Sequence, residues 1–313
     1  MVRRVLITGA NKGIGLAIAN RCLADHNDTH VILGCRSTSR GDAAAAELGA
    51  TNPDWKERVT VLQMDTSDDD SVKNAARKVE QTFGGDPHPL FGIVNNAGIA
   101  AGSIQDVLNV NIRGPRRVDT AFIPLLDPNG GRIVQMSSGA ASGCVSKSSE
   151  ARKAFFTEPN VTWAQISGLI DEVEAYSNGV KDFEEKGIGI GMVGAYGLSK
   201  ALLNSYTMLV ARENPTLKVN SCSPGMIATD IFGGFLPWWA PVPGALLRWI
   251  ATKMMNAKTP DEGTVSTMHL LFSPEIDSLP QGRYYGSDAK RSPLDIYRSP
   301  GSPPFDGARE RVG

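Results

Sequence analysis

Short apolar runs alternate with longer amphipathic stretches along this chain. The short runs, rich in Val, Ile and Leu, are apolar at consecutive positions, which is typical of strands buried on both faces of a parallel sheet. The longer stretches carry apolar residues at helical spacing. We predict strands at residues 5–7, 31–33, 59–64, 90–94, 132–136, 218–222 and 283–285. We predict helices at residues 14–24, 43–48, 69–83, 104–122, 162–173 and 196–213.

This alternation favours βαβ units and therefore a parallel sheet with helices on both faces. The pattern predicts an α/β protein with a doubly wound, Rossmann-type fold and seven parallel strands. In such folds ligands bind beyond the carboxyl ends of the strands. Functional side chains are therefore expected directly after the predicted strands.

Composition removes several classes of function. The 32 Lys and Arg residues balance 33 Asp and Glu residues, giving a net charge of −1. The excess of positive charge that is typical of a nucleic-acid-binding protein is therefore missing. We expect no metal site, because the four histidines form no cluster with cysteines. No apolar run reaches the 18 or more residues of a membrane span, so we expect no stable membrane insertion.

The cysteine pattern and the N-terminus bear on the compartment. Cys22, Cys35, Cys144 and Cys222 are scattered without paired spacing, which favours free thiols in a reducing compartment. Of these, Cys144 follows closely after the fifth predicted strand; we interpret it as a buried inert thiol, the alternative being a pocket residue. The apolar run in the first residues is too short for a signal peptide. We expect a cytoplasmic protein.

A glycine-rich loop lies between the first predicted strand and helix. Gly9 permits the turn out of the strand, Gly13 allows backbone to approach a pyrophosphate, and Gly15 lets the helix lie close to the sheet. The amides at the start of the helix then face the phosphate charge. The alternative is a turn with no ligand. The position of the loop, opening a helix after the first strand, favours a nucleotide site.

The end of the second predicted strand distinguishes between cofactors. A site selective for NAD has a carboxylate there for the ribose 2′-hydroxyl, whereas this strand ends in Gly34-Cys35-Arg36-Ser37. Arg36 is suited to pair with a 2′-phosphate, and Lys12 adds a second positive charge. The alternative is that both are solvated surface cations. We predict NADP(H) as the cofactor.

Hydroxyl and amine side chains are predicted at the same edge of the sheet as the glycine-rich loop. Tyr196 and Lys200 are four positions apart and share one face of a helix. A nearby ammonium favours the phenolate and lowers the pKa of a tyrosine. Ser137 and Ser138 end the fifth predicted strand. Their convergence with the glycine loop is more specific than any of these motifs alone.

These motifs together resemble the short-chain dehydrogenase/reductase family, over residues 1–285. The motifs that carry the resemblance are residues 8–15, Asp65, Asn95-Asn96-Ala97-Gly98, Asn111, Ser138, Tyr196 with Lys200, and Ser223-Pro224-Gly225.

The resemblance implies four catalytic residues. Tyr196 is the general acid that protonates the carbonyl oxygen, and Ser138 hydrogen-bonds to that oxygen. Lys200 binds the nicotinamide ribose and lowers the pKa of Tyr196. Asn111 holds a water in a proton relay behind Lys200.

The resemblance also places Asn95 and Gly98 at the adenosine ribose and Asp65 at the adenine. The full set of expected cofactor-binding residues is Gly9, Asn11, Lys12, Gly13, Ile14, Gly15, Arg36, Asp65, Thr66, Asn95, Ala97, Gly98, Tyr196, Lys200, Pro224, Gly225, Ile227 and Thr229.

The segment before Tyr196 is longer than in most members of the family. It resembles the insertion of the monomeric carbonyl reductase subgroup and of plant menthone and alkaloid ketone reductases, where an added helix covers the dimer surface. Trp163, Ile166, Ile170 and Val173 share one face of the predicted helix at 162–173, so we expect a monomer. We divide the chain into one domain at 1–286, with an insertion at 139–195 and a substrate lid at 226–258, and a Pro/Gly-rich tail at 287–313, either clinging to the surface or disordered.

The lid is rich in aromatic residues, including Trp238, Trp239 and Trp249. This favours a pocket for a small apolar carbonyl substrate, the alternatives being helix-packing core or a patch that touches membranes. We therefore expect an NADPH-dependent oxidoreductase that reduces a ketone, aldehyde or quinone. The alternatives are NADP-dependent oxidation of a lipid-like, terpenoid or steroid alcohol, and a non-enzymatic NADP(H)-binding sensor.

Overall fold

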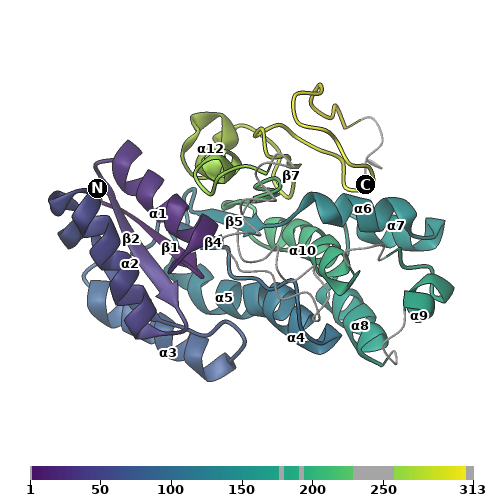
Figure 1. Ribbon diagram of the computed structural model, residues 1–313, viewed down its shortest axis with the longest axis horizontal. Helices are drawn as coiled ribbons and strands as arrows, with labels where there is room; N and C mark the ends of the chain where they lie inside the picture. The colour runs from purple at the N-terminus through teal and green to yellow at the C-terminus, as the bar shows by residue number, and fades with distance from the viewer. Residues whose placement is uncertain (1, 176–179, 190–193, 228–256, 308–313) are drawn as a thin grey trace.

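A single parallel sheet organises the molecule. The computed structural model describes residues 2–175, 180–189, 194–227 and 257–307 (Figure 1). Within them, seven strands pair in the order β3-β2-β1-β4-β5-β6-β7, which confirms the predicted fold class. The strands are β1 Arg3–Thr8, β2 Thr29–Cys35, β3 Val59–Gln63, β4 Gly92–Asn95, β5 Arg132–Met136, β6 Lys218–Cys222 and β7 Tyr284–Tyr285.

Every predicted helix is present, and the helix at 69–83 and the strands at 132–136 and 218–222 have the predicted bounds. Four further helices in the described residues were not predicted: α6 Gly139–Lys147, α7 Glu150–Phe156, α9 Val180–Glu185 and α12 Val265–Phe272. None of the helices in the described part of the chain is long and apolar enough to cross a bilayer. The helices are α1 Gly13–Asp25, α2 Thr38–Thr51, α3 Asp69–Phe83, α4 Ile104–Leu108, α5 Gly114–Phe122, α6 Gly139–Lys147, α7 Glu150–Phe156, α8 Trp163–Glu174, α9 Val180–Glu185, α10 Gly194–Glu213 and α12 Val265–Phe272.

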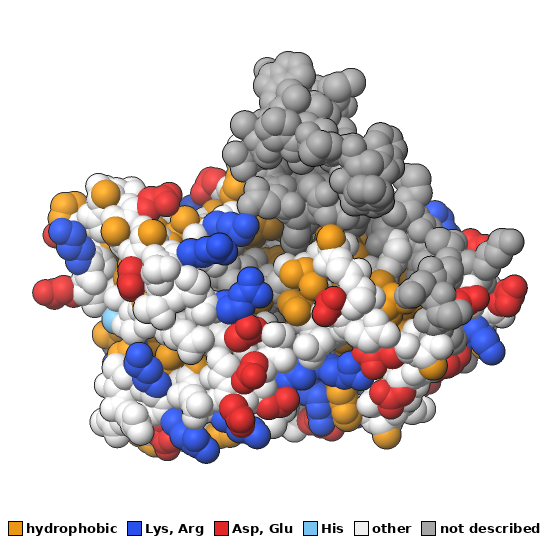
Figure 2. Space-filling view, turned by 60° about the horizontal axis from the view of Figure 1, so that its bottom comes forward, with side chains coloured by type: hydrophobic (Ala, Val, Ile, Leu, Met, Phe, Trp, Pro, Cys, Tyr) orange, Lys and Arg blue, Asp and Glu red, His pale blue; other side chains and the backbone are white. Residues whose placement is uncertain are grey.

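Helices cover both faces of the sheet because its strands are apolar on both sides. Along β1, Leu6 packs into the core formed with α3, α5 and α10, whereas Val5 and Ile7 pack into the core formed with α1, α2 and α12. This alternation follows from the two-residue period of a strand. On the face shown in Figure 2, acidic and basic side chains are intermingled.

The helix predicted at 104–122 contains a π-helical turn. Residues Asn109–Arg113 form this turn between α4 and α5. A π turn inserts one extra residue into the helical repeat, and such turns often occur at functional sites. It holds Asn111, which is fully buried.

The insertion packs onto the rest of the domain through α8 (Figure 1). Ile166, Ile170 and Val173, three of the residues predicted to share a face, are fully buried in the core with α10. Trp163 packs edge-on against Tyr206 of α10, their ring centroids 5.8 Å apart. The apolar face of α8 is therefore covered within this chain.

The segment after β7 lies along the outer edge of that strand. The Ser292 amide donates a 2.8 Å hydrogen bond to the Tyr284 carbonyl oxygen, and Arg291 forms an antiparallel bridge with Tyr285. Residues 287–307 thus cling to the surface of the domain and cover the last strand of the sheet.

Candidate active site

The loop between β1 and α1 has the geometry expected of a phosphate-binding turn. Gly9 and Gly13 have φ angles of 65° and 58°, in the left-handed region that favours glycine. A Cβ atom on Gly15 would lie 2.6 Å from both the Gly9 carbonyl oxygen and the Asn96 side-chain nitrogen. The loop can therefore carry no side chain at position 15 without moving the backbone around it.

The N-terminus of α1 is suited to an anion. Its N-cap residue, Lys12, supplies no side-chain cap, and its first turn has no acidic residue. By contrast, Ser37 and Asp68 cap α2 and α3 with side-chain oxygens. The first amides of a helix need partners, and the helix dipole favours negative charge there. Asn11 lies in the turn before Lys12, and Ile14 is the second residue of α1.

The ends of β2 and β3 lie beside this loop in the sheet. Arg36 directly follows β2 and is exposed. After β3, the Asp65 carboxylate accepts hydrogen bonds from the Ser67 amide at 3.0 Å and the Ser67 hydroxyl at 2.6 Å. Thr66 is buried, and its carbonyl oxygen accepts a hydrogen bond from Arg117.

The ends of β1 and β4 are tied together by Thr8. Its hydroxyl oxygen accepts hydrogen bonds from the amides of Asn96 at 3.0 Å and Ala97 at 2.9 Å. The Asn96 side chain donates in return to the Thr8 carbonyl oxygen at 2.9 Å. Neither Thr8 nor Asn96 was predicted as a site residue, although both lie within motifs that carry the family resemblance.

The side chain of Asn95 is turned into the core. Its side-chain amide donates a 2.7 Å hydrogen bond to the carboxylate of Asp119 in the core. Asp119 belongs to α5, so this side chain is turned toward that helix. That Asn95 borders a ribose stays a prediction.

Asn111 connects the loop after β4 with α10. Its oxygen accepts from the Ile99 amide at 2.9 Å, and its nitrogen donates to the Ile99 carbonyl at 2.8 Å and to the Ser199 hydroxyl at 3.0 Å. A Cβ on Gly98 would lie 3.2 Å from the Asn111 oxygen and 3.5 Å from the Lys200 ammonium nitrogen. Gly98 therefore lets Asn111 and Lys200 approach one another.

The structure brings Ser138, Tyr196 and Lys200 together beyond the end of β5. Ser138 is the N-cap of α6, where its oxygen accepts from the Ala140 amide at 3.2 Å, and it is hydrogen-bonded to Tyr196. The Lys200 nitrogen donates to the Met136 carbonyl oxygen at 2.7 Å and lies 5.7 Å from the centroid of the Tyr196 ring. The Met136 carbonyl was not predicted as part of the site.

Burial determines the proton affinities of this cluster. It raises the pKa of Tyr196, an effect that the hydrogen bond to Ser138 opposes in part. Burial lowers the pKa of Lys200 to about 8. The net direction reflects desolvation of the phenol, and the lowering effect expected of Lys200 stays a prediction. A raised pKa keeps the phenol protonated at neutral pH.

The turn after β6 forms another border of the site. Gly225 follows Ser223 and Pro224 with a φ of 90°, and its amide donates to the Ser223 hydroxyl at 3.1 Å. Ile227 is buried and forms a bridge with Lys258. Thr229 and most of the predicted lid, including its three tryptophans, lie outside the described residues.

The four cysteines lie in the core of the protein. All four cysteines are free and buried, and burial raises the pKa of Cys144 to about 12. Cys144 is therefore buried, as predicted; that it is inert stays a prediction. Within the described ranges, no group of three His, Cys, Asp or Glu residues could hold a metal ion.

Comparison with known proteins gives consistent relatives. Residues 3–155 match the family model described as short chain dehydrogenase. The chain is 28% identical to carbonyl reductase (NADPH) 1 of Bos taurus, covering 89% of this chain and 94% of the relative. It is 28% identical to (+)-neomenthol dehydrogenase of Arabidopsis thaliana, covering 73% and 84%. Salutaridine reductase from Papaver somniferum has a similar fold, with a TM-score of 0.71, 24% identity and coverage of 90% and 99%.

A doubly wound sheet with a Ser, Tyr, Lys cluster at its carboxyl edge defines an oxidoreductase of the α/β class. The sequence relatives extend over most of the chain and agree with this class. The chain is therefore similar to the short-chain dehydrogenase/reductase family, by the family model over residues 3–155 and by these relatives over most of its length.

Proposed function

We propose that the protein is an NADPH-dependent carbonyl reductase that converts a ketone, aldehyde or quinone to an alcohol. The observation that carries the proposal is the hydrogen-bonded pair of Ser138 and Tyr196 beside Lys200. Two hydroxyl donors side by side suit a carbonyl oxygen on which negative charge develops. The names of the sequence relatives, which include carbonyl reductases, support the same reaction.

The residues of the loop and of the strand ends fit a phosphorylated dinucleotide. The amides at the start of α1 would hold its pyrophosphate. Arg36 and Lys12 would pair with the 2′-phosphate of NADPH, since a guanidinium binds phosphate through two donors. Asp65 and Thr66 would border the adenine, and the turn from Pro224 would border the nicotinamide. NADPH, when bound, supplies the hydride to the carbonyl carbon.

Tyr196 transfers the proton in the proposed reaction. Its O–H bond breaks as the carbonyl oxygen takes the proton, while Ser138 donates a hydrogen bond to the same oxygen. The raised pKa of Tyr196 keeps this proton in place until charge develops on the substrate. Lys200 has three donors, so it can bind a ribose hydroxyl besides Met136. Asn111 acts as a positioning residue through Ile99 and Ser199.

The experiment is to follow the absorbance of NADPH with a panel of quinones, aromatic aldehydes and ketones. We expect turnover by the unaltered protein and none above background by Tyr196→Phe, which keeps the ring but removes the proton donor. Tyr196→Phe should still bind NADPH with unchanged affinity. Full activity of Tyr196→Phe would refute the proposed role of this residue.

One observation favours a second reaction, the NADP-dependent oxidation of a terpenoid or other lipid-like alcohol. The chain is as similar to (+)-neomenthol dehydrogenase as to the carbonyl reductases, at 28% identity. The same site catalyses both directions, so its geometry does not choose between them. Incubation with NADP⁺ and a panel of monoterpene alcohols tests this alternative by the appearance of NADPH.

We also propose a division of the chain and an assembly state. Residues 1–286 form the cofactor-binding domain, with an insertion at 139–195 and a substrate lid at 226–258. The packing of α8 onto α10 and of residues 291–292 onto β7 supports a monomer, because a helix face and a sheet edge are covered within one chain. The four buried free cysteines support the proposal of a reducing, cytoplasmic environment.

A further inference from the structure

A cluster of hydrogen bonds fixes the C-terminal segment, and we call it the clasp: Asp288, Ser292 and Arg298. Arg298 forms an ion pair with Asp288, and its Nε donates to the Ser292 hydroxyl at 2.9 Å. The Asp288 carboxylate also accepts from the Gly301 amide at 2.9 Å. Both charged side chains are largely shielded from solvent. The loop between residues 288 and 301 is therefore closed on itself by charge-assisted bonds.

The clasp is anchored to the domain on two sides. The Ser292 amide donates to the Tyr284 carbonyl oxygen of β7 at 2.8 Å. The Ser142 hydroxyl of α6 donates to the Pro293 carbonyl oxygen at 3.1 Å. Since α6 begins next to Ser138, these bonds place the C-terminal segment over the catalytic end of that helix.

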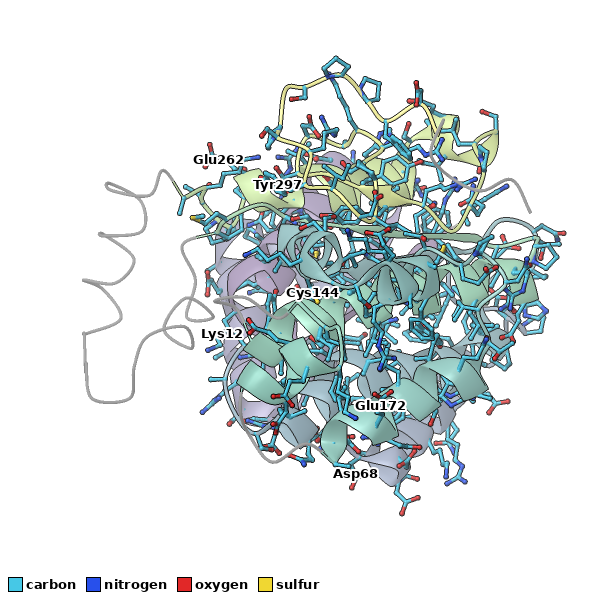
Figure 3. All side chains as sticks on the ribbon, turned by 90° about the vertical axis from the view of Figure 1, so that its right-hand side faces the viewer. Lys12, Asp68, Cys144, Glu172, Glu262 and Tyr297 are labelled. Atoms are coloured by element: carbon cyan, nitrogen blue, oxygen red, sulfur yellow. The ribbon has the colours of Figure 1, made fainter. Side chains whose placement is uncertain are left out.

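Tyr297, beside Arg298 of the clasp, lies against the start of α6 (labelled in Figure 3). A Cβ atom on Gly139 would come within 2.7 Å of the Tyr297 Cε2 atom, so the ring rests where position 139 has no side chain. Gly139 directly follows Ser138. The Tyr297 residue is nevertheless 58% exposed, so much of it faces solvent beside the catalytic serine.

Tyr297 also faces the turn after β6. Together with Ser223, Gly225 and Tyr284 it lines a small hollow. Burial raises the pKa of Tyr284, the phenol that shares this hollow with Tyr297. The ring thus joins the two loops, after β5 and after β6, that flank the proposed carbonyl site.

We infer that Tyr297 is a specificity-determining residue that contacts the substituent of the carbonyl substrate, and that it favours aromatic substituents. An exposed aromatic ring held by a fixed clasp offers a rigid face for stacking. The inference rests on the proposed function, because it assumes that the carbonyl lies at Ser138 and Tyr196. If the ring merely covered Gly139, its removal would affect all substrates alike.

The experiment compares two carbonyl substrates, an aromatic ketone and a short aliphatic aldehyde, with NADPH. We expect Tyr297→Ala to lower kcat/KM for the aromatic ketone by about tenfold or more and to change that for the aldehyde by less than about twofold. Tyr297→Phe, which keeps the ring, should retain the selectivity of the unaltered protein. Ile296→Ala is the matched control, since Ile296 is the exposed neighbour in the same segment and should leave both values unchanged.

The outcomes separate this inference from the proposed function. Equal changes for both substrates in Tyr297→Ala, or no change in either, would refute the role of Tyr297 while leaving carbonyl reduction in place. A similar loss of selectivity in Ile296→Ala would also refute it, because the effect would then belong to the segment and not to the ring. No turnover of either carbonyl by the unaltered protein would refute the proposed function and this inference with it.

Discussion

The ammonium group of Lys200 is hydrogen-bonded to the main-chain carbonyl of Met136, the last residue of β5, at 2.7 Å. The strand end therefore fixes the lysine before any ligand binds. The interaction does not require a carboxylate, and burial lowers the pKa of Lys200 to about 8. A lysine with this pKa changes its charge near the physiological range.

The pH dependence of carbonyl reduction should reflect this lysine. Because its pKa is lowered, Lys200 is charged below about pH 8 and neutral above it, whereas the raised pKa of Tyr196 keeps that phenol protonated. We expect kcat/KM for reduction to fall as the pH rises through about 8. A pH profile of kcat/KM checks this, and a flat profile up to about pH 10 would contradict it.

Ser138→Ala should separate catalysis from helix capping. Ser138 caps α6 and Ser149 caps α7, so substitution of either should lower the free energy of unfolding by about 1 kcal/mol. Only Ser138→Ala should also reduce kcat, by about 100-fold or more, because it removes a donor to the carbonyl oxygen. Denaturant unfolding and steady-state kinetics of both variants test this. Similar kcat values in the two would argue against the role of Ser138.

Arg36→Ala should weaken the binding of NADPH specifically. Loss of a charge-assisted pair with the 2′-phosphate is expected to raise the KM for NADPH by about tenfold or more and to leave the KM for NADH unchanged. Arg40→Ala is the matched control, since Arg40 is also exposed but lies on α2. A preference of the unaltered protein for NADH would overturn the assignment of Arg36.

Asp119 should make the stability of the protein depend on pH. It is fully buried, and its carboxylate accepts hydrogen bonds from Asn95 and Gln135 at 2.7 Å each. Burial raises its pKa to about 7, so between about pH 4 and 7 the folded state binds more protons than the unfolded state. The contribution of Asp119 to the free energy of unfolding therefore falls as the pH rises across this range.

Asp119→Asn is the variant that isolates this effect. It cannot ionise, so it should gain stability relative to the unaltered protein on going from about pH 5 to about pH 8, on the order of 2 kcal/mol. Urea unfolding of both proteins at the two pH values measures the difference. Parallel pH dependence in the two proteins would show that Asp119 does not titrate as stated.

The packing of α8 leads to an expectation about mass in solution. Its apolar face is buried against α10, and the Arg116 guanidinium lies 3.9 Å from the centroid of the Trp163 ring. We expect light scattering to give 33.4 kDa, the mass of one chain. A mass near twice this value would show that the chain pairs through another surface.

Sequence patterns were sufficient for the strands, for the longer helices and for the motifs of the site, but not for α6, α7, α9 and α12. The strand at 132–136 and the helix at 69–83 were predicted with their observed bounds, because apolar runs and helix capping are local signals. The carboxyl ends of parallel strands meet at one edge, so Ser138, Tyr196 and Lys200 could also be predicted to meet.

Contacts that depend on tertiary geometry could not be predicted in this way. The direction of the Asn95 side chain is set by a partner on α5, and the Lys200 pKa is set by burial. No local pattern relates Tyr297 to Gly139, because they meet only through the path of the C-terminal segment. The π turn at Asn109–Arg113 has the same periodic pattern as an ordinary helix over so short a stretch.

The segment that covers β7 also matters during synthesis of the chain. Strands β1 to β6 are all synthesised before β7, and the residues that cover the edge of β7, Arg291 and Ser292, come later still. Until they leave the ribosome, the nascent sheet presents an open edge that can pair with another chain. Proteolytic cleavage after Tyr285 would remove this segment and expose the edge of β7. We therefore expect the shortened protein to aggregate.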